Sequence, residues 1–203
     1  AVASNGHLFA LISAREVGST DTPLGVWRST DGGSTWESWY EFPCPAGTDY
    51  IEAAIEVAEG ADDRVIVAYT TNGGAGLEKE LHVAWSPLEL EDGDFSNDTL
   101  VHESDVYVSG LDLATDARMW SDYYVYLIFS DQDGDGCDIR FARSTDQGDS
   151  WESSYGLANI SVDDRGYVEP QITVGAGGWV HTAWYLWFED GHVYDSSVRY
   201  RRA

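Results

Sequence analysis

The sequence has a single lysine, Lys79, and only 11 basic residues in 203, against 36 acidic ones. The formal net charge of -25 would repel a phosphate backbone, so we expect no nucleic-acid partner. An acidic surface suits solubility, divalent cations or a saline habitat, and an acidic coat exposed to solvent is the simplest interpretation of the charge.

Long apolar runs are also missing. No run of about 18 apolar residues occurs, so we expect no membrane-spanning helix. There are two cysteines, Cys44 and Cys137, which could pair in an oxidising compartment or stay as two free thiols. The triplets that begin at Asn97 and Asn159 have the form of N-glycosylation sites, a weak sign of secretion.

Aromatic residues and glycine are plentiful. Aromatics make up 13% of the chain, there are 21 glycines, and good helix formers are sparse. This balance favours an all-β fold with many tight turns. The length is enough for one domain with a sizeable core.

One pattern, R-S-T-D-x-G-x-[ST]-W, occurs twice, at residues 28–36 and 143–151. The aspartate can accept hydrogen bonds from the backbone of its own loop, the glycine allows a left-handed conformation, and we expect the tryptophan to anchor the loop in an apolar slot. The structural residues of the two copies are Ser29, Asp31, Gly33, Trp36, Ser144, Asp146, Gly148 and Trp151.

This pattern resembles the Asp box of the bacterial neuraminidase repeat, found in the sialidase-like superfamily. The resemblance implies a β-propeller in which the box joins the two outer strands of a blade. It also implies that the box is a folding element, on the face opposite the active sites of that family.

A wider repeat supports four units. Corresponding positions at Arg28, Trp85, Arg143 and Arg201 follow at steps of 57, 58 and 58 residues. Such a period is typical of propeller blades. We therefore predict one all-β domain over residues 1–203, a β-propeller of four-stranded antiparallel blades with four repeats of about 58 residues. The repeats are at about 1–48, 49–105, 106–163 and 164–203, the last incomplete.

The expected strands begin inside the first strand of a blade and stop after the third strand of another. An unpaired edge favours association. We expect that a further segment of a longer chain, or another chain in an oligomer, completes the propeller. A self-contained ring of four blades is the alternative.

The loop at residues 130–138 carries four aspartates, three at alternate positions and one three residues later: Asp131, Asp133, Asp135 and Asp138. Carboxylates at alternate positions of a tight turn can converge on a hard cation, so we predict a calcium site here. The pattern resembles calcium loops of EF-hands and of some propeller hairpins but lacks the glutamate of the former, since Ala142 stands there. A plain acidic turn is the alternative.

Loops on the ligand face expected for this family supply further candidates. They are Arg15, Glu52, Arg165, Tyr167, Glu169 and Trp187. Sialidases use three arginines, a tyrosine–glutamate pair and an aspartate, but the F-R-I-P motif of that family is missing here. For the nearby aromatics Trp179, Trp184 and Tyr185, packing between blades is a better explanation than carbohydrate stacking.

We therefore expect an extracellular, non-catalytic propeller module for binding or assembly, with a protein or glycan ligand and calcium as a candidate stabilising ion. The alternative is part of a sialidase-like glycoside hydrolase whose remaining blades lie outside this chain.

Overall fold

The computed structural model describes residues 1–13, 23–43, 49–58, 63–72, 79–104, 106–116, 123–133, 136–152, 155–160, 169–175, 177–190 and 193–202. These residues form fourteen β-strands, and every pairing between strands is antiparallel. The predicted all-β class is confirmed. Within these ranges there is no helix long and apolar enough to cross a membrane.

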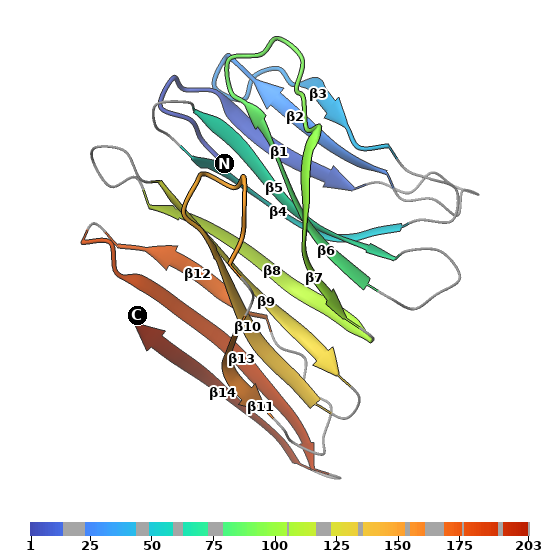
Figure 1. Ribbon diagram of the computed structural model, residues 1–203, viewed down its shortest axis with the longest axis vertical. Helices are drawn as coiled ribbons and strands as arrows, with labels where there is room; N and C mark the ends of the chain where they lie inside the picture. Colours follow the sequence, from blue (N-terminus) through green and yellow to red (C-terminus); the bar gives the residue numbers. More distant parts are fainter. Residues whose placement is uncertain are drawn as a thin grey trace.

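The strands form four sheets, each a meander in chain order. The first sheet contains β1 (Leu8–Ser13), β2 (Leu24–Ser29) and β3 (Glu37–Glu41). The second contains β4 (Asp49–Ala58), β5 (Arg64–Asn72), β6 (Lys79–Pro87) and β7 (Asn97–Ser104). The third contains β8 (Tyr107–Asp116), β9 (Tyr124–Asp133), β10 (Gly136–Ser144) and β11 (Tyr155–Ile160). The fourth contains β12 (Gln171–Val174), β13 (Val180–Asp190) and β14 (Val193–Arg202). The sheets lie in a row, from the first in blue to the fourth in red (Figure 1).

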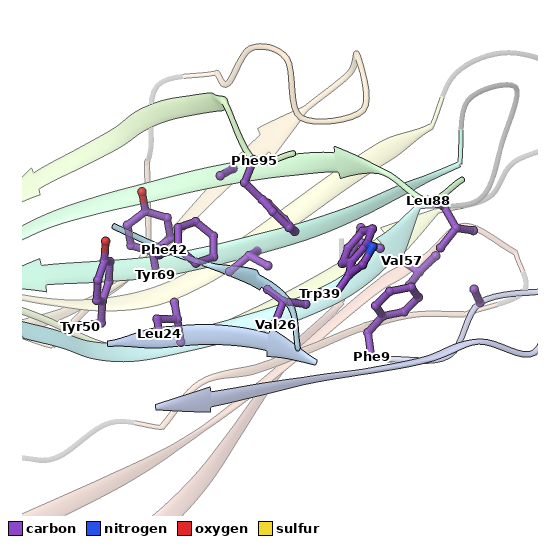
Figure 2. Packing of buried hydrophobic residues seen from close by; sticks show 14 residues of the cluster. Phe9, Leu24, Val26, Trp39, Phe42, Tyr50, Val57, Tyr69, Leu88 and Phe95 are labelled. Atoms are coloured by element: carbon purple, nitrogen blue, oxygen red, sulfur yellow. The ribbon is translucent and has the colours of Figure 1, made fainter. Parts of the chain in front are cut away.

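Apolar clusters fill the spaces between successive sheets. Between the first and second sheets, Phe9 and Trp39 lie beside Val57, and Phe42 packs against Tyr69 with ring centroids 5.0 Å apart (Figure 2). The next cluster joins residues of β5 and β6 to residues of β9, and the third joins β9 and β10 to β12 and β13. Because each strand alternates its side chains, each inner sheet offers one apolar face to each neighbour.

The first strands of the second, third and fourth sheets lie in succession, with β8 in contact with both β4 and β12. A hydrogen bond from Thr115 Oγ1 in β8 to the carbonyl oxygen of Val57 in β4, at 3.2 Å, is one of the links. In the first sheet, only an isolated bridge from Val2 to Leu8 occupies the corresponding place among the described residues.

The acidic hairpin differs from the prediction. Residues 130–138 were expected to be a loop, but β9 continues to Asp133 and β10 begins at Gly136. Asp131 lies directly opposite Asp138 in this ladder. Alternation of polar side chains also fits a pleated strand, because successive side chains point to opposite faces of the sheet. The segment that resembles a cation loop in sequence therefore forms mostly two paired strands.

The two box loops share the hydrogen bonds of their serine and aspartate. Asp31 Oδ1 accepts from the backbone N–H of Thr35 and Asp146 Oδ1 from that of Ser150, each at 2.9 Å. Hydrogen bonds from Thr35 and Ser29 lower the pKa of Asp31 to about 2. Gly33 and Gly148 have φ values of 91° and 96°, in the left-handed region that favours glycine.

The expectation that both box tryptophans fill an apolar slot is wrong for the first. Trp151 packs against the cluster between the second and third sheets, whereas Trp36 is 42% exposed. The reason is that the second sheet packs against the box loop of the third sheet. Among the described residues, no sheet packs against the box loop of the first sheet in the same way.

Candidate functional site

Two carboxylates lie on the first strands of the second and third sheets. We call these strands, together with β12, the inner strands, because they follow one another along one edge of the row of sheets. Glu52 belongs to β4 and Asp112 to β8. Both strands carry a bulge at the same place, since the ladder skips two residues after Tyr50 and two after Ser109. A bulge leaves backbone groups without a ladder partner, and these need another acceptor or donor.

The Glu52 carboxylate provides such an acceptor. Its Oε2 accepts a hydrogen bond from the backbone N–H of Gly110, which lies in the bulge of β8. Gly110 has a φ of 61°, a conformation that a residue with a side chain rarely adopts. Glu52, a candidate from the sequence, thus bridges two inner strands.

Asp112 repeats this arrangement one sheet further on. Its Oδ2 accepts from the backbone N–H of Ile172 in β12 at 2.8 Å, and its Oδ1 from that of Leu113 at 3.0 Å. Burial raises the pKa of the Asp112 carboxyl above its ordinary value, although these two N–H groups act against the shift. Asp112 was not among the residues predicted from the sequence, although its position as a carboxylate on the predicted first strand of a blade was a signal that could have identified it.

A second polar group lies between the second and third sheets. Asp131 is buried, and its Oδ2 lies 2.9 Å from His102 Nε2 in β7 and 2.6 Å from Arg140 Nε in β10. Burial alone would raise the pKa of Asp131, but the hydrogen bond from His102 and the charge of Arg140 hold it below its ordinary value.

Two of the predicted calcium ligands lie close to the positive charge of Arg140 in the structure. Asp131 faces an arginine, and Asp138 Oδ2 is 3.9 Å from Arg140 Nη2. Within the part of the chain that the structure describes, no group of three His, Cys, Asp or Glu residues is arranged to hold a metal ion. The side chain of Asp133 and all of Asp135 lie outside the described residues, so calcium binding stays a prediction.

A third polar group lies on the other face of the second sheet. His82 Nδ1 is 3.1 Å from Asp98 Oδ1, and His82 Nε2 is 3.1 Å from Glu80 Oε2. Tyr69 stacks on the His82 ring, with centroids 5.4 Å apart, and its hydroxyl donates to Asp98 Oδ2 at 2.6 Å. Burial would lower the pKa of His82, but the hydrogen bonds to Asp98 and Glu80 prevail and raise it.

The other sequence candidates do not form one site in the structure. Glu169 is exposed just before β12. Arg15, Arg165, Tyr167 and Cys44 lie outside the described residues, as does the side chain of Trp187 in β13. Among the nearby aromatics, Trp184 is buried in the cluster with the third sheet, as expected, but Trp179 and Tyr185 are exposed.

Sequence comparisons give no relative: no family model matches the chain, and no curated protein does. Solved structures do match. An α-L-arabinanase of Penicillium chrysogenum, complexed with arabinobiose, aligns with a TM-score of 0.69 at 15% identity over 98% of this chain and 60% of its own. Two structures of an α-L-arabinofuranosidase from Fusarium graminearum give TM-scores of 0.67 and 0.63 at 14% identity, over 100% of this chain and 60% of theirs.

These neighbours are β-propeller glycoside hydrolases, and the similarity shows the fold alone. The chain therefore has an all-β, antiparallel arrangement like that of a propeller and spans 60% of the length of the structures it matches.

Proposed function

We propose that this chain supplies four successive blades of an Asp-box β-propeller, in a secreted protein, and that it binds a neutral glycan without cleaving it by itself. The observation that supports a glycan ligand is the structural similarity, over 98% of the chain, to an arabinanase complexed with arabinobiose. The period of about 58 residues and the two box loops support the blade assignment.

The use of the inner carboxylates supports binding over cleavage. Glycosidases generally need two carboxyl groups that are free to act on the scissile bond. Here Glu52 and Asp112 each accept a backbone N–H of the neighbouring inner strand, so both act in holding sheets together. The net charge of -25 favours a neutral sugar, because an acidic one would be repelled.

A glycoside hydrolase is the second candidate, and one observation favours it. Asp112 lies on an inner strand and burial raises its pKa, which is the property that a general acid requires. In this alternative, a second carboxylate comes from Glu52 or from blades outside this chain.

An array of immobilised neutral and sialylated glycans tests the binding proposal. We expect retention on neutral pentose or hexose oligosaccharides and none on sialylated ones. Retention on sialylated glycans alone, or on no glycan, would overturn it. Calcium is tested in parallel by thermal unfolding with and without a chelator. If the hairpin binds calcium, the chelator lowers Tm in the native chain but not in the Asp133→Asn variant.

A further inference from the structure

The outer strand of the second sheet, β7, has little apolar attachment to the rest of the molecule. It is the last strand of its sheet and pairs with β6 alone in the described structure. Asn97 and Asp98 are exposed, Leu100 is 44% exposed, and Ser104 at the far end is buried. The outer strand of the first sheet, β3, instead inserts Trp39 into an apolar cluster. Because backbone and polar contacts hold most of β7, it should open more easily than β3.

A bulge divides β7 into two parts. The ladder with β6 skips Val101, which packs against the cluster between the second and third sheets. The next residue, His102, contacts Asp131 of the third sheet. Ahead of β7, Phe95 is buried in the cluster between the first and second sheets (Figure 2). We call residues 96–100 the strap, because they lie between these two anchored points and none of their side chains is buried.

Asp98 fastens the strap to its own sheet. Its Oδ1 lies 3.1 Å from His82 Nδ1, and its Oδ2 accepts a hydrogen bond from the Tyr69 hydroxyl at 2.6 Å. On the other side of the ring, His82 Nε2 lies 3.1 Å from Glu80 Oε2. A doubly protonated ring donates to both carboxylates, whereas a neutral ring has one proton and leaves one carboxylate facing a lone pair. The second proton on His82 therefore determines how firmly the strap is held.

The other titratable groups around this contact do not offset the loss of that proton. Glu80 and Glu103 lie opposite each other in the ladder between β6 and β7, and like charges in this position repel. Burial and nearby carboxylates raise the pKa of Tyr40 in β3, and burial raises the pKa of Tyr69 in β5. Both hydroxyls thus stay protonated near neutral pH, where the ordinary pKa of a histidine lies.

We propose that the strap opens locally when His82 loses its second proton and closes when the ring regains it. In the open form, the Tyr69 hydroxyl loses its acceptor and residues 82–85 of β6 lose their partner strand. An unpaired strand edge and an aromatic hydroxyl then become accessible at alkaline pH. The strap lies in the second sheet, away from both ends of the chain, and its opening requires no glycan.

The two partners set the pH range in which the strap is closed. Burial would lower the pKa of His82, but hydrogen bonds to Asp98 and Glu80 raise it, so this contribution is complete below 6.5 and is lost as pH rises through the folded value. Burial would raise the pKa of Asp98, but hydrogen bonds from His82 and Tyr69 lower it. That contribution is present above 3.8 and is lost as pH falls through the folded value. The strap is most firmly closed between these two limits.

Hydrogen exchange of single amides, measured by NMR at pH 6 and pH 8.5, tests the proposal. After correction for intrinsic exchange rates, the protection of the strap amides that pair with β6 should fall by about tenfold, because a charge-assisted hydrogen bond is lost. The amides of β3 are the internal reference, since the ion pair of that outer strand joins Arg28 to Glu37 and contains no histidine. The midpoint of the change should coincide with the titration of His82, followed by the chemical shift of its ring.

Two variants separate this device from general loosening of the fold. His82→Gln is neutral at every pH, so its strap should already have the alkaline level of protection at pH 6 and should not respond to pH. His7→Gln is the matched control, because His7 bonds to Asn5, and it should keep the native response. Equal protection of the native strap at both pH values would overturn the proposal, as would an equal response in His82→Gln. If His82→Gln does not fold, the two midpoints in the native chain decide, and a difference between them overturns the proposal.

Discussion

At the scale of single residues, hydrogen bonds from an arginine to a box loop and from backbone N–H groups to carboxylates join neighbouring sheets. Arg64 reaches from the second sheet to the box loop of the third, and its side chain is largely shielded from solvent. Asp112 reaches from β8 to β12. Both act where a backbone group would otherwise lack a partner, and this is where single substitutions should have the largest effect.

Replacing Arg64 should loosen the contact between the second and third sheets. Arg64→Ala removes the stacking on Trp85 and two hydrogen bonds, so we expect a loss of about 2 kcal/mol in the free energy of unfolding. Arg64→Lys keeps the charge but not the planar contact and should recover only part of the loss. Urea denaturation measures the free energy of unfolding of both variants. An Arg64→Ala variant as stable as the native chain would contradict this role.

Asp112 should be replaceable by asparagine but not by alanine. Asparagine keeps an acceptor for the N–H of Ile172 and removes the burial cost of the charge. A raised pKa means that the native state is most favoured while Asp112 is protonated, below its unfolded value of 3.8, and loses stability as pH rises through the folded value.

The stability of Asp112→Asn relative to the native chain should therefore increase from pH 3 to pH 7. Asp112→Ala leaves the N–H without its acceptor and should cost about 1–3 kcal/mol. Unfolding curves at the two pH values provide the measurement. An asparagine variant that is less stable at pH 7 than at pH 3, relative to the native chain, would show that the ionised carboxylate is required.

At the scale of secondary-structure elements, the His82 group fastens the outer strand β7 to its sheet. Asp98 of β7 contacts both Tyr69 and His82, which belong to β5 and β6. Carboxylate oxygens face both ring nitrogens of His82, so the doubly protonated ring is the form that satisfies both.

The contact of His82 with Asp98 and Glu80 should stabilise the protein less as the pH rises. The pKa of His82 is raised, so its stabilisation is complete below the unfolded value of 6.5 and is lost as pH rises through the folded value. His82→Gln should cost about 1 kcal/mol at pH 5.5 and less at pH 9. His7→Gln is the control, because His7 bonds to Asn5 and to no carboxylate in the described structure. Equal losses for His82→Gln at both pH values would exclude the charged form.

The sequence predicted the strands well because two signals agree. Continuous runs of apolar residues mark β5 and β9, and the fixed period places them at equivalent positions. The end of β9 was predicted too early, because the aspartates of a cation loop and of a paired strand both alternate. Pairing across sheets was harder to predict: that Asp131 meets His102, 29 residues away, depends on how two sheets pack.

At the scale of the whole molecule, a repeated arrangement of sheets provides the framework for the proposed ligand site. Four antiparallel sheets follow one another, and the chain aligns with 60% of longer solved structures of an arabinanase and an arabinofuranosidase at 15% and 14% identity. The two candidate carboxylates serve the repeat itself, since both link inner strands. The molecule therefore has a fold like that of part of its neighbours, and within the described residues these two carboxylates link its sheets.

The most direct test of the account is to incubate the chain with arabino-oligosaccharides, measure binding by titration calorimetry, and analyse the sugars afterwards. The account predicts a saturable heat of binding and an unchanged distribution of sugar lengths. Release of arabinose or shorter oligosaccharides, lost in the Asp112→Asn variant, would contradict it and establish the hydrolase. No heat with any neutral oligosaccharide would contradict the glycan ligand itself.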